Sequence, residues 1–228
     1  SLGTLALNAG GTGTSATSNY TLPSSAYNAT SNSASIGKVT VTLSATKTYD
    51  GTTTLSGSQV TIGGLVGTQT LTYTGATAND AHVGTASKYI NAITLADGTN
   101  GGVASNYQLP TLDNSHAAVT INVLSSVTWT GSSSGNWSTA SNWGGALPTA
   151  VNGINDVTVA IIPINKTVTF DSDNSTTRAF TGSITNNGTL QMNGASDFTL
   201  VNIIGGLGAL TKINTNVLTL VANNTYGG

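Results

Sequence analysis

The sequence predicts an all-β protein, and three observations lead to that prediction. The 228 residues include one Met and no Glu, and only 6% are charged, so the residue types that favour helices are scarce. Many short segments alternate apolar and hydroxyl side chains, as a strand with one buried face does. Between these segments stand Gly, Asn and Asp, which favour tight turns, and Gly alone accounts for 28 residues.

The charge balance argues against nucleic acid as a partner, and the short apolar runs argue against a membrane span. A formal net charge of −2, with only six Lys and Arg residues, cannot neutralise a run of phosphates, so no nucleic acid is expected to bind. No apolar run approaches the ~20 residues that cross a bilayer as a helix, so no membrane span is expected in this segment. The lack of Cys fits a long exported chain and equally a cytosolic one.

An internal repeat divides the N-terminal half of the chain. The run SNYTLP at 18–23 recurs as SNYQLP at 105–110, and the segments around both runs also correspond. Residues 1–36 are therefore expected to be the C-terminal part of one repeat, and 37–123 the whole of the next. Because 1–36 alone would have too small a core, we expect strands from a preceding portion or a neighbouring subunit to complete them.

Residues 37–123 are predicted to form a small antiparallel β-sandwich or a grasp-like sheet. Turn residues such as Asp50-Gly51 and Asp97-Gly98 separate the alternating segments. The expected strands are 38–44, 70–74, 89–93 and 118–123.

The pattern changes after residue 123. Residues 124–144 are rich in Trp, Ser and Gly, and are predicted to be a connector and the cap of the segment that follows. In 145–228 the strand candidates begin about 8–13 residues apart, a spacing typical of successive faces of a parallel β-helix, or solenoid. A second sandwich is the alternative. The candidates are 157–162, 167–170, 180–184, 189–192, 198–201, 209–212 and 217–220.

The most distinctive local motif is KTYDGTT at 47–53. Together with Val83-Gly84 in mid-domain and a Ser-Asn-Tyr run near the end, it resembles the YDG repeat of large bacterial surface adhesins. The resemblance covers 37–123, and 1–36 resemble the end of another copy. It implies an extracellular location and a structural or adhesive role.

The C-terminal part carries a second resemblance. The runs WTG at 129–131, GNWSTASNW at 135–143 and LPT at 147–149 resemble the opening of β-helical stretches in autotransporter-like and haemagglutinin-like exoproteins. The runs GGLGALTK at 205–212 and VLTLVANNTYGG at 217–228 are similar to the autotransporter-associated strand repeat. Gly227 follows Tyr226 directly, so either the last turn departs from that repeat or the register is shifted. These families imply an exported structural or adhesive protein, and supply no catalytic residues.

Asp171, Asp173 and Asn174 follow a predicted strand and form the only candidate cofactor site. Their oxygens are suitable Ca²⁺ ligands, and the two carboxylates could also act as acid and base in glycoside cleavage. The competing interpretation, which we favour, is a solvated corner where Asp and Asn form a turn. No residue is predicted to be catalytic.

Trp129, Trp137 and Trp143 have two interpretations. They either cover the apolar end of the β-helix, which we favour, or stack on sugar rings as glycan contacts.

The lysines and histidines complete the candidate residues. Lys47 to Gly51 is read as a tight turn, with an intramolecular amide from Lys38, Lys47 or Lys88 to Asn or Asp as the alternative. The two imidazoles, His82 and His116, are not expected to hold a metal ion.

Together these observations favour a structural or adhesive segment of a large exported bacterial surface or filament protein. The segment would act as a spacer and rigid rod rather than as an enzyme. Its expected partners are other copies of itself, through strand exchange in a filament or between repeats, and surface glycans or other cells. The rival hypothesis is a carbohydrate-binding or carbohydrate-cleaving β-helix protein.

Overall fold

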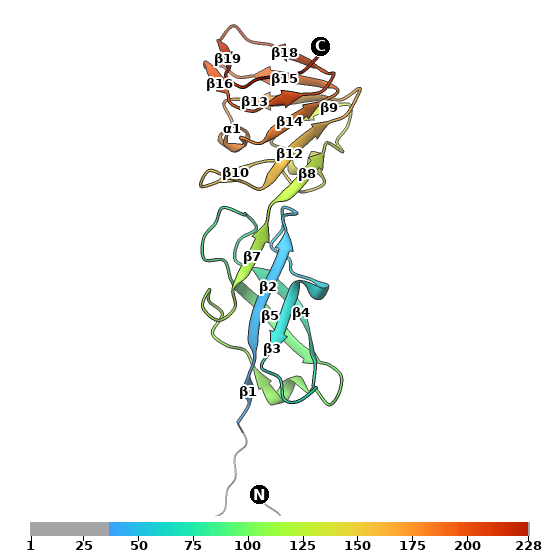
Figure 1. The fold of residues 1–228 in the computed structure, drawn as a ribbon, viewed down its shortest axis with the longest axis vertical. Helices are drawn as coiled ribbons and strands as arrows, with labels where there is room; N and C mark the ends of the chain where they lie inside the picture. Colours follow the sequence, from blue (N-terminus) through green and yellow to red (C-terminus); the bar gives the residue numbers. More distant parts are fainter. Residues whose placement is uncertain (1–36, 228) are drawn as a thin grey trace, which may run out of the picture. The chain divides into compact units, whose positions relative to one another are not determined.

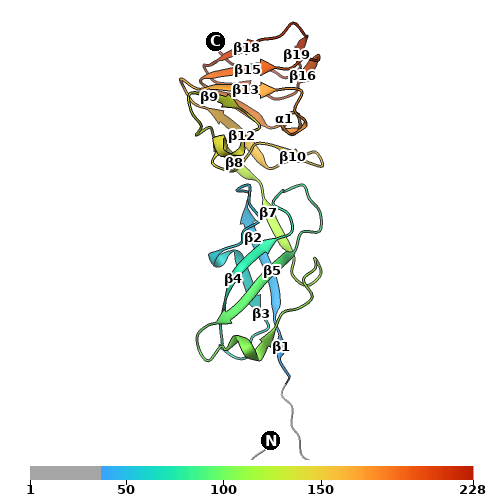
Figure 2. The same ribbon diagram turned by 180° about the vertical axis from the view of Figure 1, so that it is seen from behind.

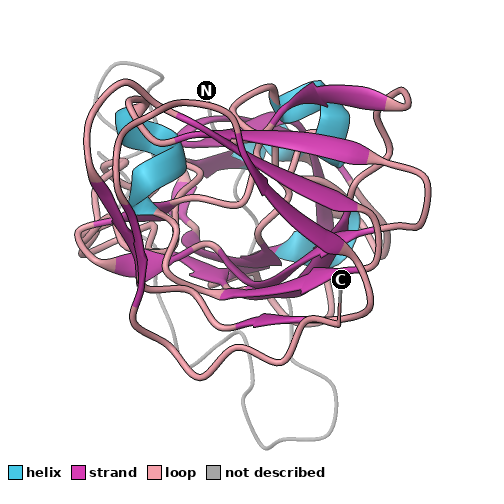
Figure 3. Ribbon diagram, turned by 90° about the horizontal axis from the view of Figure 1, so that it is seen from above, coloured by secondary structure: helices cyan, strands magenta, loops and turns pink. Residues whose placement is uncertain are grey.

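The computed structural model describes residues 37–227, so the predictions for 1–36 lie outside the described residues. From Val39 onward the chain forms one compact unit. This unit is nearly all β, which confirms the predicted class; strands dominate Figures 1, 2 and 3, and the helical segments are short. These segments are α1 (Ser175–Ala179) and the 3-10 turns η2 (Gly57–Gln59), η3 (Ala104–Asn106) and η4 (Ala140–Trp143).

The N-terminal part of this unit contains three small sheets. Their strand orders are β3-β2-β7, β4-β5 and β1-β6. The strands are β1 (Val39–Thr40), β2 (Thr42–Thr48), β3 (Val60–Gly63), β4 (Leu71–Ala78), β5 (Ile90–Asp97), β6 (Tyr107–Gln108) and β7 (Val119–Asn122).

Both parallel and antiparallel pairs occur in these sheets, whereas the sandwich, one of the two predicted alternatives, was expected to be antiparallel. Strand β2 pairs antiparallel with β3 but parallel with β7, and β1 pairs parallel with β6. Parallel neighbours require a long connection, and here most of the domain lies between β2 and β7. Alternation in the sequence specifies which face of a strand is buried, but it does not specify the direction of the neighbouring strand.

The C-terminal part is built mainly from parallel pairs. Two four-stranded sheets have the orders β17-β14-β12-β8 and β18-β15-β13-β9, and a third sheet pairs β16 with β19. An antiparallel hairpin joins β10 to β11. The strands are β8 (Leu124–Thr128), β9 (Ser134–Asn136), β10 (Ala150–Val151), β11 (Ile154–Asn155), β12 (Val157–Ile162), β13 (Thr167–Asp171), β14 (Ser183–Asn186), β15 (Thr189–Asn193), β16 (Phe198–Leu200), β17 (Ile204–Gly205), β18 (Ala209–Lys212) and β19 (Leu218–Leu220).

The later strands repeat with a constant register. Thr189 pairs with Ala209 and Phe198 with Leu218, so each residue lies beside the one 20 positions further along. Alternate residues point inward and form apolar columns, as the sequence pattern predicts. Val168 and Leu190 are paired neighbours in one column, and both are fully buried.

Residues 124–144 contribute more than a connector. Within them, β8 pairs with β12 and β9 pairs with β13, each in parallel. The two large sheets therefore begin about twenty residues before the predicted boundary at residue 145. Strand β9 consists of Ser, Gly and Asn, and it carries no apolar alternation by which the sequence would reveal it.

Candidate functional site: the joint around Asp156

Lys47 lies on the buried face of β2, where alternation would place an apolar residue. Its side chain has no exposed surface. The ammonium donates hydrogen bonds to Asp50 Oδ1 at 2.7 Å, to Thr52 O at 3.0 Å and to Thr54 O at 2.9 Å. Because these acceptors replace water around the buried charge, Lys47 fixes the path of the loop that follows Tyr49.

Asp50 is the charged partner of Lys47 in this loop. Burial alone would raise the pKa of its carboxyl, but hydrogen bonds from Lys47 and Thr52, together with the Lys47 charge, hold that pKa below its ordinary value. The carboxylate is therefore the form that the loop binds. An ionised carboxylate facing a protonated amine forms an ion pair, which differs from the amide-forming arrangement considered for Lys47.

Lys88 organises a second loop in the same way. It is 7% exposed, and its ammonium donates to Val83 O at 3.0 Å and to Thr85 O at 2.5 Å. These bonds hold residues 83–85 around the charge. Both acceptors are backbone carbonyls, so the structure assigns Lys88 to loop ordering, as it does Lys47.

The two lysine-held loops contact the C-terminal part of the compact unit. Tyr49 is 3% exposed, and its hydroxyl donates to Leu147 O at 3.2 Å. The Tyr49 ring stacks on His82 with the centroids 6.1 Å apart. Tyr49 thus joins the motif loop to the second loop and to the backbone of the following segment.

Two glycines allow close approach at this contact. A Cβ on Gly51 would lie 2.0 Å from Gly145 O, and a Cβ on Gly84 would lie 1.9 Å from Val151 O. Gly51 also has a φ of +78°, which favours glycine by itself. Gly84 lies outside the left-handed region, so the approach of Val151 is the reason for glycine at that position.

We call this contact the joint; the loop residues Tyr49, Gly51 and 82–84 meet the segment 145–151 and Asp156 there. Asp156 is its centre. It lies immediately before β12 and is fully buried. Its Oδ1 accepts from the Val83 backbone N–H at 2.6 Å, and its Oδ2 lies 2.6 Å from His82 Nδ1. The Asp156 backbone is also bonded within the C-terminal part, to Thr149 O and to the Leu124 N–H. One rigidly placed carboxylate therefore binds the second loop from across the joint.

The joint also affects the Tyr49 phenol. Burial raises its pKa above the ordinary value, and the nearby Asp156 and Asp50 charges raise it further. Tyr49 consequently remains a neutral hydrogen-bond donor through the alkaline range in which an exposed tyrosine ionises. Next to it, an open cavity of ≈ 480 Å³ is bordered by Tyr49, Gly51, His82 and the segment 145–151.

The predicted acidic corner uses its oxygens on the backbone. Asp171 Oδ1 accepts from Asp173 N at 3.0 Å, and Asp173 Oδ2 accepts from Ala195 N at 2.6 Å. Asn174 is the N-cap of α1, where its side-chain oxygen accepts from Thr176 N and Thr177 N. The arrangement matches the turn interpretation, with its oxygens directed at N–H groups. Within residues 37–227, no three His, Asp or other ionisable ligand side chains are grouped for a metal ion.

The three tryptophans are buried together. Trp129, Trp137 and Trp143 are at most 2% exposed, and their rings contact one another at centroid distances of 5.2 and 4.8 Å. Each indole N–H donates to a backbone carbonyl, at 2.8–3.1 Å. Their faces are packed against protein, so they leave no ring open to a sugar. That they cover the end of a β-helix stays a prediction.

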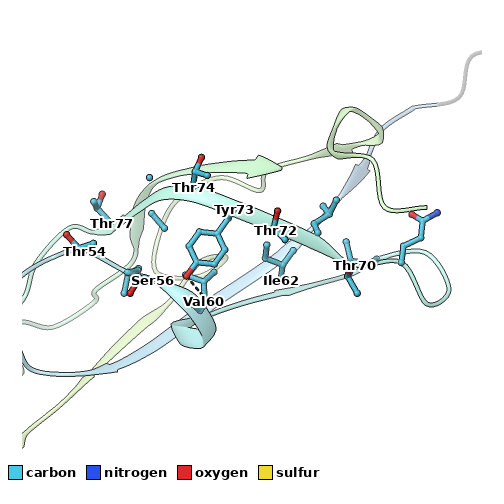
Figure 4. Close-up of a pocket in the computed structure, with 16 residues that line it drawn as sticks. Thr54, Ser56, Val60, Ile62, Thr70, Thr72, Tyr73, Thr74 and Thr77 are labelled. Carbon is cyan, nitrogen blue, oxygen red and sulfur yellow. Dashed lines mark hydrogen bonds between the residues drawn. The ribbon is translucent and has the colours of Figure 1, made fainter. Parts of the chain in front are cut away.

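A second cavity lies between β3 and β4 and is open to solvent (Figure 4). It measures ≈ 990 Å³, and its lining from Thr54 to Thr77 contains hydroxyl and apolar side chains, the amide of Gln69 and no charged residue. Tyr73 crosses it and donates from its hydroxyl to Gly57 O at 2.9 Å. No feature of this groove was predicted from the sequence.

The sequence indicates the loops on the N-terminal side of the joint, but not the residues that they contact. The run at 47–51 is the most distinctive local motif of the sequence, and Val83-Gly84 belongs to its resemblance to the YDG repeat; both contribute to the contact. Asp156 and His82 were not predicted to meet, because a separation of 74 positions in the sequence leaves no local signal. Within the described residues, none of the helices has the length and apolar character needed to cross a membrane.

Comparison with known proteins identifies the N-terminal part alone. Neither a curated protein nor a solved structure shows significant similarity to the chain. The family model of the YDG domain matches residues 34–117, a range that includes Lys47, Asp50 and Lys88 with the loops they hold. Residues 34–117 of this chain are therefore a YDG domain.

Proposed function

We propose that this chain is a structural segment of a large exported bacterial surface or filament protein, in which it acts as a stiff spacer. The observation that carries the proposal is the joint, where the buried Asp156 binds His82 and Val83 of the YDG domain. A flexible linker would join the two parts without such contacts. Here hydrogen bonds join the YDG domain to the C-terminal part, and Gly51 and Gly84 allow the two backbones to approach closely.

The C-terminal part supports the same role as a β-helical rod. Its parallel pairs, the 20-residue register of its later strands and its buried apolar columns are the features expected of a parallel β-helix. Each coil contacts mainly the coils before and after it, so stiffness increases with the number of coils. The proposed location is the extracellular surface, where such a rod provides reach.

Adhesion to surface glycans or to other cells belongs to the same proposal. The chain carries few charges, which suits contact with a neutral sugar. Because the tryptophans are buried, the uncharged groove beside Tyr73 is the surface that we propose for such a sugar. A glycan array tests this part. Binding that is lost in Tyr73→Ala supports adhesion through the groove, whereas no binding on the array leaves the spacer role alone.

The stiffness of the joint can be measured by single-molecule energy transfer. The chain has no Cys, so Thr68→Cys and Ser196→Cys, both at exposed positions, would place one dye on each part. We expect one narrow distribution of transfer efficiency for the parent, and a broad one after Gly84→Ala, which forces Val151 O away. Gly37→Ala is the matched control, because nothing lies within 4 Å of its added Cβ. A broad distribution in the parent would refute the stiff spacer.

The rival proposal is an enzyme that cleaves polysaccharide. It predicts activity that disappears in Asp171→Asn or Asp173→Asn. The hydrogen bonds of both carboxylates to backbone N–H groups favour the structural role instead.

A further inference from the structure

The groove beside Tyr73 lies between two strand edges. Strand β3 is the outer strand of the sheet β3-β2-β7, and β4 pairs only with β5, so each has one side that no strand of residues 37–227 covers. Other strands, β8 among them, are also paired on one side only, but the ≈ 990 Å³ groove lies against β3 and β4 (Figure 4). An open strand edge presents backbone N–H and C=O groups to which another molecule can bind.

The C-terminal end of β4 is already occupied on the side away from β5. There Leu55 N donates to Ala76 O, and Ala78 N donates to Thr53 O. The segment 53–55 therefore lies along this end of the edge. It follows that the even-numbered residues at this end of β4 direct their backbone N–H and C=O groups away from β5.

The N-terminal end of β4 is open on the same side. The register of β4 against β5 is the same before and after the irregularity at Thr77, so the alternation continues along the strand. The backbone N–H and C=O groups of Thr72 and Thr74 therefore point away from β5. Within residues 37–227, no backbone group outside the sheets bonds to them. Both residues line the groove, so their free amide groups lie at its edge.

The surface between the two edges is apolar and carries no charge. Ile62, Leu65, Leu71 and Tyr73 line it, and all four are only partly buried. Its volume of ≈ 990 Å³ is at the upper end of the range of about 300–1,000 Å³ that ligand pockets occupy. A charged ligand would lose water here without gaining a charged partner, so a neutral ligand fits best.

We propose that this groove binds a neutral oligosaccharide whose sugars carry acetamido groups, as N-acetylglucosamine does. The acetamido group is a secondary amide like the peptide bond, so its N–H and C=O can pair with the free backbone groups of Thr72 and Thr74 as a neighbouring strand would. Its methyl group and the apolar face of the sugar ring match the apolar lining, where the Tyr73 ring supplies an aromatic surface. The inference rests on the proposed adhesion through this groove, and it names the class of sugar.

A pair of trisaccharides tests the proposal on the full chain. Triacetylchitotriose and cellotriose have the same linkage, and they differ only in carrying acetamido or hydroxyl groups at one ring position. In a titration followed by nuclear magnetic resonance, we expect triacetylchitotriose to have a dissociation constant at least about tenfold lower than that of cellotriose, a difference of about 1.4 kcal/mol. The amide signals of Thr72 and Thr74 should shift with triacetylchitotriose, and those of β13 should not.

Two variants at one position test the role of the backbone. Thr74→Pro removes one free N–H, and an edge strand tolerates proline where its N–H faces outward. We expect this variant to lose the preference for triacetylchitotriose, whereas Thr74→Ala, which keeps the N–H, should retain it. If Thr74→Pro does not fold, the amide shifts of the parent still decide.

The outcomes separate the inference from the proposed adhesion. Equal affinity for the two trisaccharides overturns the inference and leaves adhesion to neutral sugars standing. Binding of neither trisaccharide overturns the inference, and the glycan array then decides whether adhesion survives. Amide shifts confined to other strands also overturn the inference. So does tighter binding of a capped, uncharged peptide of alternating Val and Thr, because it would assign the edge to strand addition instead.

Discussion

The two parts of the compact unit differ in what they place at buried positions. The YDG domain buries the ammonium groups of Lys47 and Lys88 and surrounds them with carbonyl oxygens. The C-terminal part fills equivalent strand positions with apolar columns such as Val168, Leu190 and Leu210. The YDG domain must hold irregular loops against the C-terminal part, whereas the C-terminal part is built mainly by repeating parallel strand pairs.

The difference shows what each kind of backbone requires. Strands in register bond to each other, so their side chains are free to be apolar. Loops have no such partner, and a buried cation or amide must bind their carbonyls. The C-terminal part follows the same rule at its corners, where Asn202 donates to Phe180 O and Gly182 O, and Asn216 donates to Ser196 O.

The largest effect is expected in the apolar column. Leu190 is itself fully buried, so Leu190→Ala would leave a cavity in the column and should lower the free energy of unfolding by about 3 kcal/mol. Urea unfolding monitored by circular dichroism measures it. Thr189→Ala, on the outer face of the same strand, is the control. A loss below that of the control would mean that the columns do not stabilise this part.

The buried cation should rank next. Lys47→Met leaves the carbonyls of Thr52 and Thr54 without their donor, and should cost about 2 kcal/mol. The same unfolding measurement applies, with Lys38→Met as the matched loss of one exposed cation. Equal effects of the two changes would contradict the loop-ordering role of Lys47.

Tyr49 links the comparison to pH. Its pKa is raised in the folded protein, so the unfolded chain ionises first above about pH 10, and stability should fall as the pH rises from there. Tyr49→Phe should cost about 1 kcal/mol at neutral pH through the lost bond to Leu147 O, and should reduce the alkaline loss. Stability curves at several alkaline pH values test both effects, and an unchanged alkaline slope would contradict the assignment.

Asp50 should give the smallest effect. Burial opposes ionisation, but the bonds from Lys47 and Thr52 lower its pKa, so its stabilisation is present above about pH 4 and is lost as the pH falls through the folded value. Because the side chain is 51% exposed, the contribution should stay below about 1 kcal/mol. Comparing acid unfolding of the parent with Asp50→Asn measures it. If Asp50→Asn lost more stability than the parent as the pH falls, the stabilising role of the Asp50 carboxylate would be contradicted.

Strand positions could be predicted where the apolar alternation is complete. The segments 157–162 and 209–212 were predicted with the bounds that β12 and β18 have. Strands β3 and β9 were missed, because they are short and β9 has no apolar side chain. The direction of pairing was also beyond the pattern, since a strand in a parallel or an antiparallel pair can bury the same face.

The candidate site was predictable only within one loop. The run at 47–53 has a local signature, because a turn needs specific residue types. The carboxylate that binds His82 comes from a distant segment, and an Asp before a strand is common enough to carry no signal. Likewise, the sequence marks Trp129, Trp137 and Trp143 as notable without specifying whether their rings face protein or solvent.

The glycine at position 84 has a consequence for how YDG domains combine with other modules. Its own backbone does not require it, and the residue that excludes a side chain there belongs to the segment after the domain. The requirement for glycine at position 84 therefore comes from the segment that follows the domain, and not from the fold of the domain itself. In a protein assembled from many such units, a bulkier residue at the corresponding place would mark a unit that meets its successor through a different contact, or that stands free of it.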